Sequence, residues 1–454
     1  MSSVYFKFLK KIPIIKRLIN RFTILDNEIK LLTKENASLK ENIKYCEDEI
    51  WNLKRLIKIQ NKDRIKVVFV CWRPSVWGSL KSVYEAMKAD NHFEVIILTI
   101  PNKKQLPDLE LNHEIYESEG AEDFWKGDNV LSGYNYETGE WFDLQTLKPD
   151  YVCFQQPYNA CRTFTQKSWV VRKYAKLFYV HYASNFIGSG VLEESNPPDF
   201  VKDISLYFNQ SQMDYDLIHE YLKKTNNTTT KQFLTGFPRY DNLEQYNNSE
   251  SPLWSYPRTK NCFRLIWTPR WCTNEGNCCF FDYKDWFIEY SKNHPNLDFI
   301  FRPHPQAFLN WISSGELSEP EAEAYKNEYE KLPNTRIDNS KEYLSTFYSS
   351  DCMVTDVSSI VADYFLTGKP IIYCHKKDCF NDFSRKLSEG FYWVRNHKEL
   401  EATLTMLQAG EDPLKQKRQD LIKEAFYIPK QSSGELIKNI IKDDFYDKLE
   451  KKYE

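Results

Sequence analysis

The 454-residue chain has no long apolar run and no excess of charge of one sign. Its longest apolar runs, such as Val67 to Cys71 and Val95 to Ile100, fall far short of the roughly 20 residues that a membrane-spanning helix needs. Lys and Arg number 61 against 64 Asp and Glu, a formal charge of −3. A protein that binds nucleic acid through its whole surface needs a strong basic excess, so we expect no nucleic-acid partner.

The chain also lacks regular cysteine spacing and glycine-rich phosphate loops. Its 11 cysteines are scattered, and no secretory signal precedes them, which predicts reduced thiols in a cytoplasmic protein. Cys272, Cys278 and Cys279 are too irregular for a zinc site, so we expect no metal. No Walker loop and no GxGxxG motif occurs. A hydrophobic fraction of 41% nevertheless excludes disorder as the main state.

Residues 1–22 form a basic segment with interleaved apolar residues. This segment contains six basic residues and no acidic one. Such a pattern is typical of a chain end that lies on an anionic membrane surface, and the alternative is a solvated tail that Pro13 interrupts. We therefore expect a peripheral protein on the inner face of the cell membrane.

Residues 23–62 show a heptad repeat, with apolar residues at alternating spacings of four and three from Leu25 to Ile57. Isoleucine occupies most a positions and leucine most d positions, and Asn36 is a polar residue at an a position. This combination favours a parallel two-stranded coiled coil and hence a homodimer. The alternative is a single amphipathic helix that folds back on its own globular domain.

From Arg64 onward, short apolar runs alternate with helical patterns, which predicts mostly parallel, doubly wound α/β sheets. The turn-rich stretch from Asn247 to Lys260 separates two such domains. We expect an N-terminal Rossmann-like domain over residues 63–250 and a C-terminal one over 251–430. Residues 431–454 are expected to form a helical tail. Ligands bind at the carboxyl ends of parallel strands, so the cleft between the domains is the predicted site.

Two groups of polar residues follow strands of the second domain. Ser358 and Ser359 lie where a predicted strand meets a helix, and free backbone donors at such a position suit a phosphate. Arg302 and His304 follow the preceding apolar strand in the sequence FRPHP. A guanidinium and an imidazole there suit a diphosphate and the charge that develops on a leaving phosphate. The structural alternatives are a capping serine and a histidine that only holds a loop.

In the first domain, His181 follows an apolar strand and precedes a loop of small residues. A histidine that faces the cleft can accept the proton of an attacking hydroxyl, although a lone histidine near a strand is more often structural. Arg239 and Asp241 follow another strand and are expected to order the cleft.

Four segments resemble the CDP-glycerol glycerophosphotransferase family of teichoic-acid and related polymer enzymes. They are TPRW (Thr268 to Trp271), FRPHP, TGFPRYDNL and YLSTFYSSDCMVTDVSSIVADYFLTGKPIIY. The resemblance implies a GT-B architecture and transfer of a phosphoalcohol from a CDP-alcohol to a hydroxyl, without a bound metal or other cofactor. It places the family's two histidines at His181 and His304, and it adds Arg270 and Asp356 to Arg239, Arg302 and the serine pair as donor-binding candidates.

The expected reaction is transfer of a phosphoalcohol unit, glycerol phosphate above all, to a cell-envelope glycopolymer or a lipid-linked acceptor, with release of CMP. Two alternatives remain open. One is a GT-B glycosyltransferase that uses a nucleotide sugar in capsule or surface-polysaccharide synthesis. The other is a non-catalytic coiled-coil scaffold of an envelope-polymer assembly complex.

Overall fold

The computed structural model describes residues 13–104, 115–118, 120–184, 197–259, 262–340 and 342–449. The chain divides into two compact units. The first holds residues 1–63 together with Lys173–Ala175, and the second holds 64–172 and 176–454. The basic segment expected to lie on a membrane falls partly outside the described residues.

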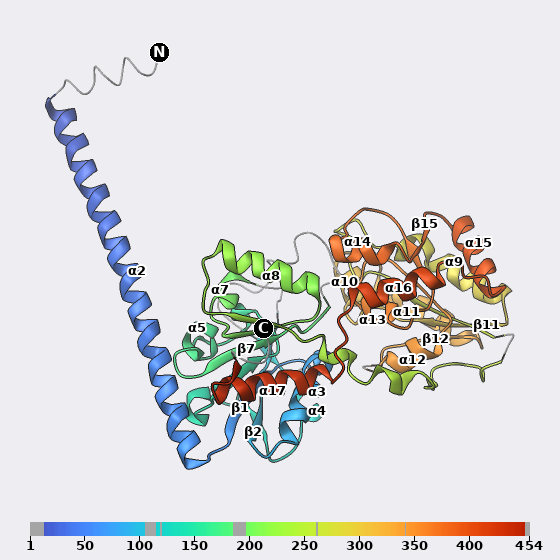
Figure 1. Ribbon diagram of the computed structural model, residues 1–454. Helices are drawn as coiled ribbons and strands as arrows, with labels where there is room; N and C mark the ends of the chain where they lie inside the picture. Colours follow the sequence, from blue (N-terminus) through green and yellow to red (C-terminus); the bar gives the residue numbers. More distant parts are fainter. Residues whose placement is uncertain are drawn as a thin grey trace. The chain divides into compact units, whose positions relative to one another are not determined.

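The first unit contains one long helix, α2, which runs from Pro13 to Asn61 (Figure 1). The described part of this helix is unbroken from Pro13 through residue 22. Within the described residues, no helix is both long enough and apolar enough to cross a bilayer.

The first domain of the second unit is a seven-stranded sheet in which every neighbouring pair is parallel. The strand order is β5-β2-β1-β6-β7-β8-β9. The strands are β1 (Ile65–Cys71), β2 (Phe93–Thr99), β5 (Val130–Ser132), β6 (Tyr151–Phe154), β7 (Lys176–Val180), β8 (Leu206–Asn209) and β9 (Lys231–Leu234). A short antiparallel pair, β3 (Asn102–Lys104) and β4 (Ile115–Glu117), lies outside this sheet.

The second domain is a six-stranded parallel sheet of order β12-β11-β10-β13-β14-β15. Its strands are β10 (Phe263–Thr268), β11 (Leu297–Phe301), β12 (Thr335–Ile337), β13 (Cys352–Thr355), β14 (Ile371–Cys374) and β15 (Tyr392–Val394). The strands are buried along almost their whole length, as expected when helices cover both faces of a parallel sheet. The predicted pair of doubly wound sheets is therefore confirmed.

Helices connect the strands in both domains. In the first domain they are α3 (Gly78–Lys88), α4 (Ala121–Phe124), α5 (Ser168–Val171), α7 (Pro198–Val201) and α8 (Gln212–Lys224). In the second they are α9 (Phe280–Asn293), α10 (Ala307–Ser313), α11 (Glu319–Lys331), α12 (Leu344–Ser349), α13 (Ile360–Phe365), α14 (Asp382–Ser388), α15 (His397–Gln408) and α16 (Lys415–Ala425). Short 3₁₀ segments also lie in the described loops, and they are Pro74–Val76, Leu144–Leu147, Asn159–Cys161, Phe164–Gln166, Pro238–Tyr240 and Leu243–Tyr246.

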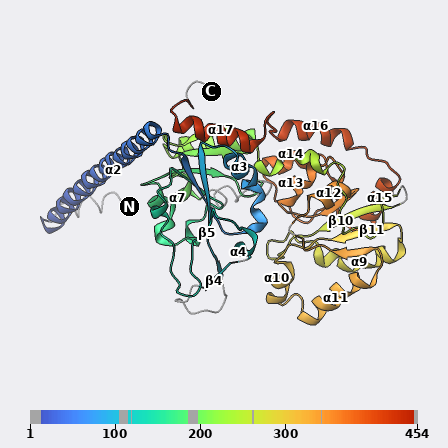
Figure 2. The same ribbon diagram turned by 90° about the horizontal axis from the view of Figure 1, so that it is seen from below.

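The chain returns to the first domain at its end. Helix α16 lies beside the second domain, and α17 (Ser433–Phe445) packs against α3 in the first (Figure 2). A Cβ at Gly434 would lie 2.3 Å from the Ser82 hydroxyl, so only glycine permits this close approach. The carboxylate of Asp241 accepts hydrogen bonds from the Ser433 and Gly434 backbone N–H groups at 2.7 and 2.9 Å. Asp241 therefore joins the start of α17 to the first domain.

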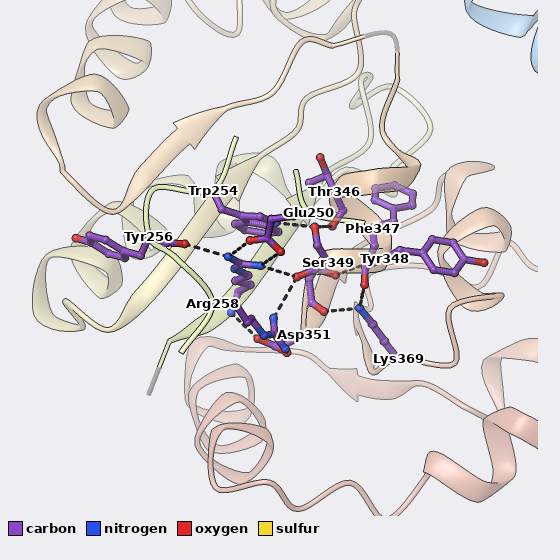
Figure 3. Close-up of polar contacts among 12 residues, drawn as sticks. Glu250, Trp254, Tyr256, Arg258, Thr346, Phe347, Tyr348, Ser349, Asp351 and Lys369 are labelled. Atoms are coloured by element: carbon purple, nitrogen blue, oxygen red, sulfur yellow. Dashed lines mark hydrogen bonds and ion pairs between the residues drawn. The ribbon is translucent and has the colours of Figure 1, made fainter. Parts of the chain in front are cut away.

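The segment between the domains is fixed by a buried arginine. The Arg264 side chain is fully buried in β10 and donates to the Glu250 carboxylate at 2.9 Å. Asp351 accepts from the Arg264 backbone N–H at 2.8 Å, and the Lys369 ammonium donates to the Ser350 carbonyl at 2.6 Å (Figure 3). Because Arg264 donates to Glu250 and also to the Tyr256 carbonyl at 3.0 Å, the turn-rich stretch is held against the second sheet.

Candidate active site

A pocket of about 590 Å³ lies between the two domains, where the carboxyl ends of their strands meet. The first domain contributes the loops after β1 and β7 together with Arg239. The second contributes the loops after β10, β11, β12 and β13. A larger hollow of about 800 Å³ lies between α9 and α11, but none of the predicted site residues borders it. The interdomain pocket is therefore the candidate site, in the position that open parallel sheets favour.

Arg302 and His304 line this pocket from the loop after β11. The Arg302 guanidinium is paired with the buried Asp338 carboxylate and donates to the Ser340 carbonyl at 2.9 Å. It also lies over the Tyr343 ring, 4.8 Å from the ring centre. These contacts hold the planar guanidinium in one orientation, as a preorganised anion site requires.

The His304 ring borders the pocket and lies 5.9 Å from the Trp271 ring, centre to centre. Desolvation and the nearby guanidinium groups of Arg270, Arg73 and Arg302 lower its pKa to about 4. The imidazole is therefore neutral near pH 7. The Gln306 backbone N–H lies 3.2 Å from Nδ1, so Nδ1 accepts and Nε2 carries the proton. In this form, His304 offers an N–H donor.

Ser358 and Ser359 line the same pocket and follow β13. Ser359 occupies the N-cap position of α13, but its side chain makes no capping hydrogen bond. The Ser184 hydroxyl, from the loop after β7, donates to the Ser359 carbonyl at 3.0 Å. The serine pair thus lies where the two domains touch. Because α13 has only six residues, the site depends on these side chains more than on a helix dipole.

Arg239 connects the domains across the pocket. It belongs to the 3₁₀ segment Pro238–Tyr240 of the first domain. Its guanidinium donates to the Tyr343 hydroxyl at 2.8 Å and lies 3.4 Å from the Asp363 carboxylate, and both partners belong to the second domain. The electrostatic effects of Tyr343 and Asp363 outweigh desolvation and raise the pKa of Arg239 above its ordinary value. The guanidinium is charged and acts as an interdomain tie.

Arg270 and Asp356, which the sequence resemblance named as donor-binding candidates, are not among the residues that line the pocket. The Arg270 guanidinium pairs with Glu275, and its Nη2 donates at 2.7 Å. The Asp356 carboxylate is buried and accepts from the Arg270 and Cys279 backbone N–H groups at 2.6 and 2.8 Å. Asp356 therefore shapes the loop after β10. Arg270 acts on the pocket through its charge near His304.

His181 lies at the end of β7 and is buried, with 2% of its surface exposed. Its Nε2 lies 2.9 Å from the Tyr207 hydroxyl and 2.9 Å from the Asp214 carboxylate. The next three residues, Tyr182 to Ser184, line the pocket, whereas His181 does not. The expectation that His181 faces the cleft is therefore wrong for this arrangement. The Asp214 partner on α8 is distant in sequence, so the chain order did not reveal it.

Arg73 also lines the pocket and was not among the residues predicted from the sequence. Gln155 fixes the loop, since its Oε1 accepts from the Trp72 and Arg73 backbone N–H groups at 2.8 and 3.0 Å. Its Nε2 donates to the Arg73 carbonyl at 3.0 Å. The Arg73 guanidinium lies over the Trp72 ring at 4.1 Å. An arginine two residues after a buried strand was the one signal that pointed to it.

The pocket as a whole is electropositive. Three arginines line it, at positions 73, 239 and 302, against the carboxylates of Asp338 and Asp363, and each carboxylate is paired with one arginine. Such a surface suits an anion with several oxygens, for example a diphosphate. Among the residues that the structure describes, no three His, Cys, Asp or Glu side chains gather as metal ligands would.

A comparison with known families finds a match to one part of the chain. Residues 209–400 match the model of the family described as CDP-Glycerol:Poly(glycerophosphate) glycerophosphotransferase. This segment includes Arg239, Arg302, His304 and the serine pair, and the match confirms the predicted resemblance. No curated protein matches the chain.

Several solved structures share the fold. A putative UDP-N-acetylglucosamine 2-epimerase from Listeria monocytogenes has a TM-score of 0.54 at 12% identity and covers 85% of this chain and 97% of its own. The UDP-GlcNAc 2-epimerase of Neisseria meningitidis bound to UDP-GlcNAc has a TM-score of 0.52 at 12% identity, and the match covers 85% of this chain and 100% of the epimerase. A variant of the wall teichoic acid polymerase TagF has a TM-score of 0.51 at 11% identity, and the match covers 95% of this chain and 99% of the polymerase. At these identities the likeness establishes the fold, a GT-B-like pair of α/β domains.

Proposed function

We propose that this protein is a transferase that moves a phosphoalcohol unit, glycerol phosphate in the first instance, from a CDP-alcohol to a hydroxyl group. The acceptor is a cell-envelope glycopolymer or a lipid-linked precursor, and CMP is released. One observation carries the proposal: the interdomain pocket brings three guanidinium groups, an imidazole N–H and two serines together. The family match over residues 209–400 supports the choice of donor.

The proposed reaction is an in-line displacement at the β-phosphorus of the donor. The acceptor oxygen forms a new bond to that phosphorus while the bond from phosphorus to the bridging oxygen breaks, and CMP carries the bridging oxygen away. The hydroxyl proton passes to solvent or to the departing phosphate. Such reactions depend mainly on positioning and on stabilisation of the developing charge.

Arg302 and His304 act on the leaving phosphate in this proposal. The Arg302 guanidinium holds the diphosphate oxygens, and the Nε2–H of His304 donates to the oxygen on which charge develops. A neutral imidazole keeps this donor without adding a fourth positive charge to the empty pocket. Bound phosphate then raises the pKa of His304, since a nearby anion favours the charged form.

His181 acts as a positioning residue in this proposal. Its contacts with Tyr207 and Asp214 fix the strand end from which Tyr182 to Ser184 enter the pocket. The Tyr182 hydroxyl, which lies 2.8 Å from that of Tyr158, and the Ser184 hydroxyl then border the acceptor side.

A donor screen tests the proposed reaction. The purified protein is incubated with CDP-glycerol, CDP-ribitol, UDP-GlcNAc and other nucleotide sugars, each with and without a hydroxyl-bearing acceptor. Acceptor-dependent release of CMP from a CDP-alcohol is expected. Release of a nucleoside diphosphate from a nucleotide sugar would support a glycosyltransferase instead. No turnover of any donor, with intact fold by circular dichroism, would favour the scaffold alternative.

The peripheral location on the inner face of the cell membrane is part of the same proposal, because the acceptor is expected there. Its support is the charge pattern of residues 1–22. A truncation that lacks these residues should sediment less with anionic vesicles than the intact chain does. Equal sedimentation would refute the membrane role and leave the donor assignment untouched.

A further inference from the structure

Helix α2 carries most of the large apolar side chains that are exposed on the described part of the protein. Eight of these exposed residues follow the heptad spacing, and they are Leu25, Ile29, Leu32, Leu39, Ile43, Ile50, Leu53 and Ile57. Each has at least half of its surface exposed. A seam of this kind is not expected to remain in water, because burial of apolar surface drives helix association.

The seam is long and continuous. It runs over 33 residues of one unbroken helix, from Leu25 to Ile57, which corresponds to about 50 Å at 1.5 Å per residue. Alternating spacings of four and three keep it on one face of a slightly supercoiled helix. A partner must therefore offer a helix of similar length and the same periodicity.

We propose that the occupant of this seam is α2 of a second copy of the chain, in a parallel and in-register coiled coil. The a positions hold Ile29, Asn36, Ile43, Ile50 and Ile57, and the d positions other than Cys46 hold leucine. Isoleucine at a and leucine at d favours two parallel strands. Asn36 meets a hydrogen-bonding partner inside the seam only when it faces Asn36 of the other copy.

The charges beside the seam select the same orientation. Glu49 occupies a g position, and Lys54, five residues later, occupies the following e position. In a parallel pair, these positions lie opposite one another across the two helices, so Glu49 of each copy faces Lys54 of the other. An antiparallel pair would place g positions opposite one another, which brings together glutamates such as Glu28, Glu35 and Glu49. Charge complementarity therefore favours the parallel arrangement.

Cys46 provides a direct test of this register. It lies at a d position, its thiol is free and exposed, and residues 1–63 contain no other cysteine. In a parallel, in-register pair, the two Cys46 side chains share one layer of the seam, close enough for mild oxidation to join them. In an antiparallel pair, they lie in different layers.

The experiment uses the full-length chain. Light scattering at micromolar concentration should give twice the monomer mass of 54.1 kDa. Mild oxidation should convert most of the protein into a covalent dimer on a non-reducing gel, and Cys46→Ser should abolish that band. The ten other cysteines remain in this variant, so it is also the control for cross-links elsewhere.

Matched substitutions separate the seam from the rest of the helix. Ile43→Glu with Ile50→Glu should halve the mass and remove the cross-link. Leu31→Glu adds the same charge at an exposed position outside the seam and should change neither. Thermal unfolding by circular dichroism shows whether the α/β domains of each variant remain folded. A monomeric intact chain would overturn the proposal in favour of a helix that packs on its own domains. A dimer without the Cys46 cross-link would overturn the parallel register.

Discussion

The contact between Arg239 and Asp363 allows a quantitative test of the interdomain tie. The two side chains come from different domains, and their exposed fractions are 14% and 5%. Replacing Arg239 with methionine keeps much of the volume but leaves the Asp363 carboxylate buried without its arginine, while the Tyr343 hydroxyl still donates to it. Loss of one partner of a buried pair costs about 3–5 kcal/mol. The remaining hydroxyl places the expected loss near the lower limit, about 3 kcal/mol, or a factor of about 150 in the unfolding equilibrium.

A double-mutant cycle measures this pair directly. Urea unfolding followed by tryptophan fluorescence gives the free energy of unfolding for Arg239→Met, Asp363→Asn and the double variant. We expect a coupling energy of about 1.5–3 kcal/mol, because neither charge is then left alone in the double variant. The control is Arg258→Met, which removes an arginine–aspartate pair whose arginine is 48% exposed. That variant should lose less than about 1 kcal/mol. A coupling below about 0.5 kcal/mol for Arg239 and Asp363 would refute the tie.

Three further predictions concern the pocket. His304→Gln should lower kcat by about 10²-fold or more. Because the pKa of His304 is about 4, kcat/KM of the unmodified protein should show no change between about pH 5 and 7 that is due to titration of His304. An unchanged kcat in the variant would remove His304 from the mechanism. Arg73→Met should raise the donor KM by about tenfold to a hundredfold, as expected when a charge-assisted hydrogen bond is lost. The NMR titration of His304 should also shift to higher pH, because one of the charges that lower its pKa is gone. Lys81→Met removes a positive charge from an exposed position of α3 that does not line the pocket and is the control. An unmoved titration would contradict the placement of Arg73. Burial raises the pKa of Asp356 to about 7. The contribution of this group to stability is therefore fully present below about pH 4 and is lost as the pH rises through 7. Asp356→Asn should flatten the dependence of the unfolding free energy on pH over that interval. A pH dependence identical to that of the wild type would show that Asp356 does not titrate there.

The strands of both sheets were predictable because parallel strands covered on both faces are continuous apolar runs. Ile65–Cys71 and Leu297–Phe301 show this directly. The edge strand Val130–Ser132 carries no such signal, because it has three residues, of which two are partly exposed and Ser132 is exposed.

The candidate site was partly predictable. Arg302, His304, Ser358 and Ser359 follow strands of one sheet, and the carboxyl ends of parallel strands share an edge, so their proximity follows from chain order. The same reasoning failed for Asp356 and His181. Both also follow strands, but their side chains turn inward to satisfy buried partners, and that choice depends on residues far away in the chain.

Local pattern alone thus specifies the long heptad helix, the two α/β domains and the strand ends where a ligand binds, since each depends on a periodicity within a few neighbouring residues. The folded chain decides which polar side chains reach the pocket. Arg73 enters it because Gln155 on the adjacent strand end fixes its loop. Arg239 reaches Asp363 because the folded chain places the 3₁₀ segment after β9 next to α13. Hydrogen bonds between distant segments select these orientations, and no local sequence pattern contains that information.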